Sequence, residues 1–308
     1  PSPIAFDMLS SCCIQIAGLD YQFSSPANVF VEDLTQPSYA SFRRPVNAPA
    51  SAERLDICLT PLEDRRVPGR FRHVITTDLQ SQIYRAGPVW LIQRFGTGPA
   101  EGMLRWSTVY DSQQETVATA GPARCGAAHT FVLPELGFYP HYQFLLTGFL
   151  ARRRGALHHC AGAICRGRMF LFPARSGTGK STLSRLLAAS GRFAIAGDDR
   201  IVTRQRDHQW LAFGTPWPST AGFSANLSAP LGGIFFLHQA PDNRVEELAP
   251  QDALRRLLPV TDIPWYDEAF TAGVLAHCEK LVTSVPMRAF HFRPDPSAVE
   301  CLEEALDA

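Results

Sequence analysis

The stretch that most constrains the fold of this chain is LFPARSGTGKSTLSRLL, at residues 171–187. An apolar run ends at Phe172, a loop of small residues follows, and a Gly-Lys-Ser tripeptide (179–181) opens a segment with helical spacing. A strand, a glycine-rich turn and a helix in this order predict a phosphate-binding loop, because backbone N–H groups and the positive end of the helix converge on an anion. Ala174 stands where the usual pattern has its first glycine, and alanine fits there if its φ is negative.

In such a loop the lysine bridges the β- and γ-phosphates of a nucleotide, and the next hydroxyl holds Mg²⁺. We therefore assign Lys180 to the phosphates and Ser181 to the metal. A chance Gly-Lys-Ser turn is the alternative, but it does not explain the apolar strand before the loop or the helix-forming segment after it. The residues expected to bind the nucleotide are Arg175, Ser176, Gly177, Thr178, Gly179, Lys180, Ser181 and Thr182.

Two adjacent carboxylates, Asp198 and Asp199, follow a short apolar strand in GRFAIAGDDRIV (191–202). One can ligate Mg²⁺ while the other faces a phosphate acceptor as a general base, and a polar turn is the alternative. Upstream, His158 and His159 lie in the strand that precedes the loop strand. Neighbouring residues of a strand point to opposite faces, so only one of them can reach the site. These residues alone leave the role of the histidine undecided.

The combined pattern LHHCAGAICRGRMFLFPARSGTGKSTL…AIAGDDRIV resembles the catalytic domain of HPr kinase/phosphorylase and its relatives, which share a core with phosphoenolpyruvate carboxykinase. The resemblance covers roughly residues 140–240. It extends more loosely to MRAFHFRPDPSAVECLEEAL (287–306), which is similar to the final strand and helix of HPr-kinase-related proteins. His159 lies fifteen residues before Ala174, the separation expected for the active-site histidine of the family.

The resemblance also implies roles for the catalytic residues Asp198, Asp199, His159 and Lys180. Asp198 is the first choice for the base that takes the proton of the acceptor hydroxyl. Asp199 then helps Ser181 hold Mg²⁺, and His159 stabilises charge or tunes the base. The roles of the two aspartates can be exchanged.

The resemblance implies an α/β fold, with a P-loop catalytic domain built on the mixed sheet of HPr kinase and phosphoenolpyruvate carboxykinase (136–308). The residues before it predict a β-rich N-terminal domain (1–135), which the family does not share. The first part is β-rich because several stretches alternate apolar and polar residues, as in VWLIQRF (89–95). The Pro/Ala/Ser-rich segment 36–53 predicts a loop or a mobile connection, and PHYQFLLTGFLARRR (140–154) predicts a helix. We expect the N-terminal domain to supply substrate recognition or oligomer contacts, with a homo-oligomer as one expected state.

Composition narrows the setting of the protein. Lys+Arg and Asp+Glu balance at 29 each, which gives no global charge that would favour nucleic acid as a partner. No apolar run approaches the ~20 residues of a spanning helix, and the first residues lack the basic region of a secretory signal, so no membrane partner is expected. The eight cysteines form no C-x-x-C pair and predict buried free thiols in a reducing, cytoplasmic setting.

These features predict an ATP- and Mg²⁺-dependent kinase that transfers the γ-phosphate to a hydroxyl group, with the serine of a peptide or protein as the first expectation. The alternatives are a small-molecule hydroxyl kinase of the same fold, a non-catalytic ATP-binding regulatory module, and an ATPase coupled to motion. HPr as the acceptor and a reverse phosphorylase activity are not expected. The β-rich N-terminal part does not resemble the α/β N-terminal domain of HPr kinase, and GFSANLSAPLG (222–232) lacks the longer family signature that goes with phosphorylase activity. The surrounding loop and strand (214–237) offer Trp217, Ser219, Asn226 and Ser228 as candidates to shape the acceptor site.

Overall fold

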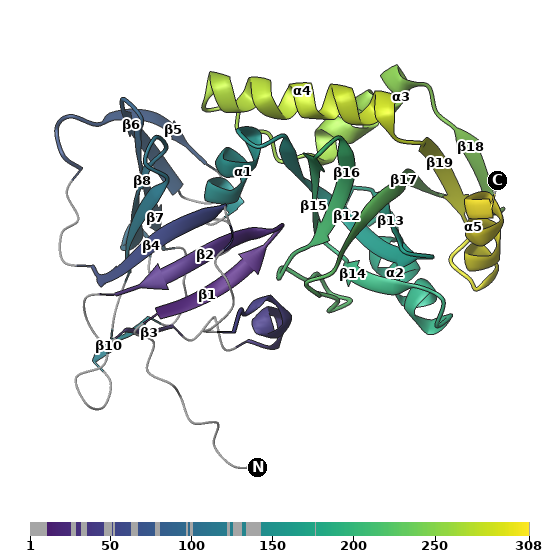
Figure 1. The fold of residues 1–308 in the computed structure, drawn as a ribbon, viewed down its shortest axis with the longest axis horizontal. Helices are drawn as coiled ribbons and strands as arrows, with labels where there is room; N and C mark the ends of the chain where they lie inside the picture. The colour runs from purple at the N-terminus through teal and green to yellow at the C-terminus, as the bar shows by residue number, and fades with distance from the viewer. Residues whose placement is uncertain are drawn as a thin grey trace, which may run out of the picture. The chain divides into compact units, whose positions relative to one another are not determined.

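The structure is a computed structural model that describes residues 11–25, 29–31, 36–45, 51, 53–62, 67–77, 81–96, 98, 101–121, 124–125, 131–133, 143–175 and 177–307. Contacts within the chain divide it into two compact units, Pro1–Leu145 and Leu146–Ala308. The division falls within helix α1 (Gln143–Ala151) (Figure 1). The functional domains expected at 1–135 and 136–308 stay a prediction.

The first unit contains an eight-stranded mixed sheet. Its strands, in spatial order, are β1 (Ser11–Ile16), β2 (Leu19–Ser24), β4 (Arg54–Pro61), β9 (Thr116–Gly121), β8 (Leu104–Asp111), β7 (Val89–Phe95), β6 (Ser81–Ala86) and β5 (Arg72–Thr76). The pairs β2–β4 and β4–β9 are parallel and the others antiparallel. A smaller sheet has the order β10 (Arg124–Cys125), β11 (Phe131–Leu133), β3 (Val29–Val31).

One expectation for this unit is corrected by the structure. Part of the segment predicted as a loop, 36–53, is the 3₁₀ helix η2 (Pro37–Phe42). Proline at its start has the φ that a helical turn needs, and Tyr39 and Phe42 are both buried. Burial of two aromatic side chains therefore orders a stretch whose composition alone is typical of a loop.

The second unit is built on another eight-stranded mixed sheet. A continuous path of pairings runs through β13 (Arg168–Pro173), β12 (Gly155–Cys165), β15 (Arg200–Arg206), β16 (Gln209–Gly214), β17 (Ser228–Gln239), β19 (Met287–Phe292) and β18 (Arg244–Glu247). A short strand, β14 (Ala194–Gly197), pairs with β12. Strand β13 also pairs in parallel with β17, which closes a circuit of five strands. The two long strands β12 and β17 make this possible because each pairs with different neighbours along its length.

Helices cover both faces of this second sheet (Figure 1). Helices α2 (Lys180–Ala189) and α5 (Ser297–Asp307) pack on a cluster that contains Phe170 and Phe172. Helix α3 (Pro250–Leu257), the 3₁₀ turn η6 (Leu258–Val260) and α4 (Glu268–Ser284) pack on the cluster that contains Met169 and Leu171. Alternate residues of β13 thus enter opposite cores, as a strand buried on both faces requires.

Several elements expected in this unit are confirmed. The helix predicted over 140–154 is described as α1, and Arg152, Arg153 and Arg154 form the turn after it. The turn at Arg166 and Gly167 joins β12 to β13, with φ of 51° and 73°, as the twist of a two-residue hairpin favours. The mixed α/β class is confirmed as well.

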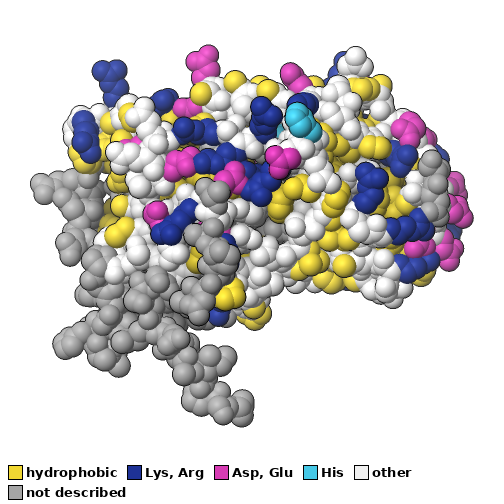
Figure 2. Space-filling view, in the orientation of Figure 1, with side chains coloured by type: hydrophobic (Ala, Val, Ile, Leu, Met, Phe, Trp, Pro, Cys, Tyr) yellow, Lys and Arg dark blue, Asp and Glu magenta, His cyan; other side chains and the backbone are white. Residues whose placement is uncertain are grey.

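Three further findings concern the charged surface, the helices and the thiols. In the view of Figure 2, basic and acidic side chains lie interspersed on the visible face, in keeping with the equal numbers of each. Among the described residues, no helix combines the length and apolar character needed to cross a bilayer. Seven cysteines are described as free thiols, and three of them, Cys160, Cys165 and Cys278, are buried.

Candidate functional site

The glycine loop, residues 174–179, joins the buried end of β13 to the first turn of α2. Gly177 and Gly179 have φ of 81° and 106°, in the region that side chains disfavour. A Cβ on Gly179 would lie 2.7 Å from Cζ of Phe292, so the close packing of β19 also requires glycine there. Ala174 is absent from the described residues with positive φ, which explains why alanine is accepted at this position. Ser176, predicted to bind nucleotide, lies outside the described residues.

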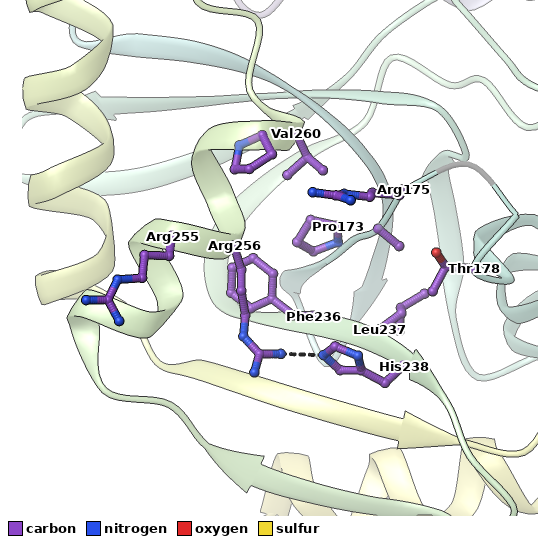
Figure 3. Close-up of a pocket in the computed structure, with 11 residues that line it drawn as sticks. Pro173, Arg175, Thr178, Phe236, Leu237, His238, Arg255, Arg256 and Val260 are labelled. Carbon is purple, nitrogen blue, oxygen red and sulfur yellow. Dashed lines mark hydrogen bonds between the residues drawn. The ribbon is translucent and has the colours of Figure 1, made fainter.

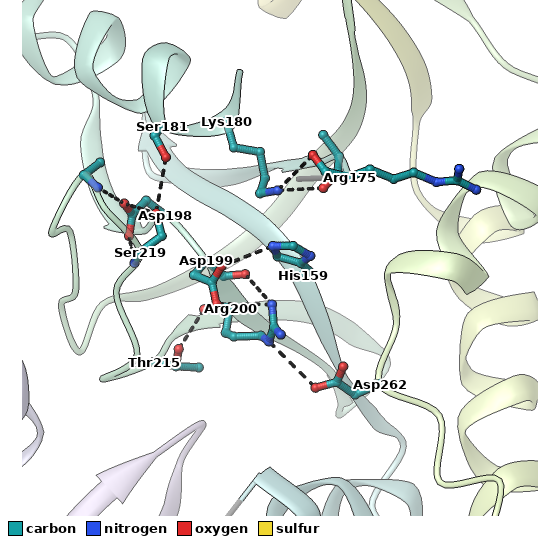
Figure 4. A network of polar contacts seen from close by, with 12 residues as sticks. His159, Arg175, Lys180, Ser181, Asp198, Asp199, Arg200, Thr215, Ser219 and Asp262 are labelled. Carbon is teal, nitrogen blue, oxygen red and sulfur yellow. Dashed lines mark hydrogen bonds and ion pairs between the residues drawn. The ribbon is translucent and has the colours of Figure 1, made fainter. Parts of the chain in front are cut away.

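Lys180 is the first residue of α2 and turns back over the glycine loop (Figure 4). Its Nζ donates hydrogen bonds to the carbonyl oxygens of Ala174, at 2.7 Å, and of Arg175, at 3.4 Å. The side chain is buried, and this burial lowers the pKa of its ammonium group. The loop thus holds a cation at its centre, where an anion bound by the loop amides would meet it.

Asp198 is fully buried and has every carboxylate oxygen satisfied. Its Oδ1 accepts from the backbone N–H of Ser219 at 2.9 Å. Its Oδ2 accepts from Ser219 Oγ at 2.7 Å and from the N–H of Ala221 at 3.0 Å. The hydroxyl of Ser219 lies 3.3 Å from that of Ser181, the second residue of α2. Asp198 therefore fixes the loop after β16 and, through Ser219, reaches the predicted metal-binding hydroxyl.

Asp199, by contrast, has a side chain that is 23% exposed and faces His159. Nε2 of His159 lies 3.1 Å from one of its carboxylate oxygens, and Nη1 of Arg200 lies 3.2 Å from the other. Desolvation by itself would raise the pKa of Asp199, but the hydrogen bond from His159 and the charges of Arg200 and Lys180 lower it overall. The result is an ionised carboxylate that retains access to solvent.

Arg200 joins this pair to a residue that the sequence did not single out. Its Nε lies 3.8 Å from Oδ2 of Asp262, which follows η6 and whose N–H donates to Leu157 of β12. Desolvation raises the pKa of Asp262, although Arg200 and His159 act against this. No local motif marks Asp262, because only the fold brings it to Arg200 from more than sixty positions along the chain.

His158 lies away from this network, between two threonines. Its ring nitrogens are 2.9 Å from Oγ1 of Thr261 and 2.8 Å from Oγ1 of Thr203, and Thr203 in turn contacts His277 of α4 at 2.8 Å. Burial lowers the pKa of His158 and of His277 to about 3, so both are neutral near pH 7. The two neighbouring histidines thus face different surroundings, one polar and accessible and one closed.

The structure brings the predicted residues together unevenly. Lys180, Ser181, Asp198, Asp199 and His159 converge from β12, α2 and the β14–β15 connection (Figure 4). Thr182 follows them in α2. Of the candidate acceptor residues, Ser219 enters the network and Trp217 is buried, whereas Ser228 is the first residue of β17.

The donors present fit a magnesium ion. Among the described residues, no group of three or more His, Cys, Asp and Glu side chains converges as a ready-made metal centre. The hydroxyl of Ser181 backed by Asp198 instead offers the few oxygen donors that Mg²⁺ uses when phosphates and waters complete its octahedron.

No protein-family model matches the chain, and no curated protein matches it. Among solved structures, it is similar to the HPr(Ser) kinase/phosphatase from Coxiella burnetii, at 15% sequence identity and a TM-score of 0.28. The match covers 49% of this chain and 99% of that one. This is a distant structural likeness, and the properties of the site come from its own geometry.

Proposed function

We propose that this protein is an ATP- and Mg²⁺-dependent kinase that transfers the γ-phosphate to a hydroxyl group, with the serine of a peptide or protein as the favoured acceptor. The observation that carries the proposal is the pairing of His159 with an accessible, ionised Asp199 beside the Lys180 loop. A binding module needs a phosphate loop but has no use for a carboxylate that can accept a proton.

The phosphate end of the site rests on α2 and its loop. Backbone N–H groups at the helix start and the glycines before it suit the β-phosphate, and Lys180 suits the β- and γ-oxygens. Reaching them requires the ammonium to exchange the carbonyls of Ala174 and Arg175 for phosphate oxygens. Mg²⁺ at Ser181 would neutralise charge on the same phosphates.

The geometry favours the exchanged roles of the two aspartates over the assignment preferred from the sequence. Asp198 already accepts three hydrogen bonds within the buried interior and lies on the Ser181 side, so it suits the support of Mg²⁺. Asp199 has solvent access and accepts a hydrogen bond from His159, so it is suited to take the proton of the phosphate acceptor. In the transfer, the acceptor oxygen forms a bond to the γ-phosphorus, the bond to the β-phosphate oxygen breaks, and Asp199 takes the hydroxyl proton as ADP leaves.

Arg200 and His159 support this reaction by holding the base. Arg200 contacts one oxygen of Asp199 and His159 the other, so the carboxylate is fixed in a single orientation. Asp262 adds a negative charge on the other side of Arg200, 3.8 Å from its Nε. Preorganised charge of this kind accounts for most of the rate enhancement in phosphoryl transfer.

The proposal is tested by incubating the protein with ATP, Mg²⁺ and candidate acceptors, serine peptides and small hydroxyl compounds separately. ADP formation and phosphate added to the acceptor, seen by mass spectrometry, are the readouts. We expect Asp199→Asn to lower the rate of phosphate transfer by roughly 10²–10⁴-fold while ATP still binds. Lys180→Ala should lower both the rate of transfer and the affinity for ATP. Asp207→Asn is the matched control, because Asp207 is exposed in the β15–β16 turn.

The same assay separates the alternatives. Phosphate found only on small hydroxyl compounds identifies a small-molecule kinase of the same site chemistry. Tight ATP binding without transfer to any acceptor would contradict the kinase and favour a regulatory module. ADP release that proceeds at the same rate without acceptor would identify an ATPase.

A further inference from the structure

A pocket of about 300 Å³ opens beside the start of the glycine loop (Figure 3). The loop contributes Ala174, Arg175 and Thr178 to its wall, so any ligand seated on the loop amides is directly adjacent to it. This volume is at the lower end of the range for small-molecule sites, roughly 300–1,000 Å³. The reaction described above uses none of the space.

The pocket lies on the side of the loop away from the carboxylates. In Figure 4 the side chain of Arg175 points away from Ser181 and Asp198. The acceptor is expected on the Asp199 side, so the γ-phosphate faces that way. The nucleoside, at the opposite end of the nucleotide, must then leave the loop on the side away from Asp199. The pocket borders the loop on that side.

The lining of the pocket is apolar with a basic edge. Phe236 and Val260 are buried apolar side chains that contribute to it. Arg175 and Arg256 are cations on its border, together with Arg255, which pairs with Asp252. Among the described residues that line it there is no carboxylate. A flat, uncharged ring attached to an anion matches both properties, because the ring packs on apolar groups and guanidinium planes stack on aromatic faces.

One guanidinium is held in place by a neutral partner. Arg256 donates a hydrogen bond to Nε2 of His238 on β17 (Figure 3). Burial, followed by the charges of Arg256 and His291, lowers the pKa of His238, which keeps its ring neutral and able to accept. The planar group of Arg256 is therefore oriented at the pocket before any ligand arrives.

We propose that this pocket binds the nucleoside of the nucleotide whose phosphates occupy the glycine loop, with the base stacked against Arg256 and packed on Phe236 and Val260. The inference rests on the proposed function, because it takes the loop to be a phosphate site. It adds the residues of α3, η6 and β17 to a nucleotide site that the sequence assigned to 175–182 alone.

The test compares the affinities of ATP and inorganic tripolyphosphate by calorimetry, in the absence of acceptor. Tripolyphosphate has the phosphate chain but no nucleoside. We expect the parent to bind ATP more tightly than tripolyphosphate. Arg256→Ala should lower the affinity for ATP about tenfold and change the affinity for tripolyphosphate much less. Arg256→Lys keeps the charge without the planar group. It should have the affinity of the parent for tripolyphosphate but only part of the affinity of the parent for ATP.

Arg192→Ala is the matched control, because Arg192 follows the opposite end of α2 and pairs with Glu303. It should leave both affinities unchanged. If the parent binds both ligands but Arg256→Ala binds ATP like the parent, the pocket does not hold the nucleoside, and the kinase proposal still stands. If Arg256→Ala weakens both ligands equally, Arg256 acts on phosphate and the inference is overturned. Failure of the parent to bind either ligand would refute the phosphate loop itself.

Discussion

At the scale of single residues, the site is governed by environments that differ between sequence neighbours. Asp198 and Asp199 are adjacent, yet one is buried under three hydrogen bonds and the other is partly exposed against His159. His158 and His159 diverge in the same way, because strand neighbours point to opposite faces. The residue types were readable from the sequence, but the distribution of roles between neighbours was not.

The two aspartates give the first prediction. Asp199→Asn should reduce turnover at every Mg²⁺ concentration, because it removes the base. Asp198→Asn should raise the Mg²⁺ concentration needed for half-maximal rate and lower stability by about 1–3 kcal/mol, since an amide nitrogen would then face backbone donors. Initial rates across a Mg²⁺ titration and urea unfolding measure both effects. If saturating Mg²⁺ rescues Asp199→Asn but not Asp198→Asn, the original assignment of the base is the right one.

At the scale of elements, a site is built where β13, its loop and α2 succeed one another. The hairpin of β12 and β13 was predictable because a two-residue turn separates two apolar runs. The helix was predictable from its spacing. Neither the helical turn η2 nor the position of Asp262 beside Arg200 was predictable from the sequence, because both depend on partners distant along the chain.

The loop glycines give a prediction at this scale. Gly177 and Gly179 both have positive φ, so alanine at either should cost roughly 1–2 kcal/mol of backbone strain. A Cβ at 177 meets nothing within 4 Å, whereas one at 179 meets Phe292. Gly179→Ala should therefore lower the free energy of unfolding more than Gly177→Ala. The comparison uses urea denaturation of the two variants, and equal losses would show that the β19 contact does not restrict the loop.

At the scale of the second unit, the closed circuit of strands and the two helical layers enclose a buried cluster of hydrogen-bonded side chains. This histidine cluster consists of His158, Thr203 and His277. Strands β12 and β15 and helix α4 contribute one member each. Because both imidazoles are neutral, the hydrogen bonds of the histidine cluster form without a buried charge.

The histidine cluster predicts that the stability of the protein depends on pH. Both histidines have a pKa of about 3 when folded, against about 6.5 when unfolded, so between these values the unfolded chain binds more protons. Stability should therefore fall as the pH drops below about 6.5, by up to about 1.4 kcal/mol per pH unit for each histidine. Urea unfolding at pH 7, 6 and 5 measures the slope.

His277→Gln should reduce this slope by about half. His208→Gln is its control, because His208 is exposed in the β15–β16 turn. If His277→Gln leaves the slope of unfolding free energy against pH unchanged, protonation of the histidine cluster does not cause the loss of stability.

The sequence by itself determined the local parts of this protein, namely the strand–loop–helix unit, the hairpin before it, the paired carboxylates and the mixed α/β class. These follow from periodicity and turn chemistry within a short window, where each residue acts through near neighbours. Only the tertiary structure decided that Asp198 is closed off by Ser219, that Asp199 meets His159 and Arg200, and that Arg256 and Val260 border the glycine loop. Burial and electrostatic environment arise from contacts between distant segments, and local sequence patterns do not encode them.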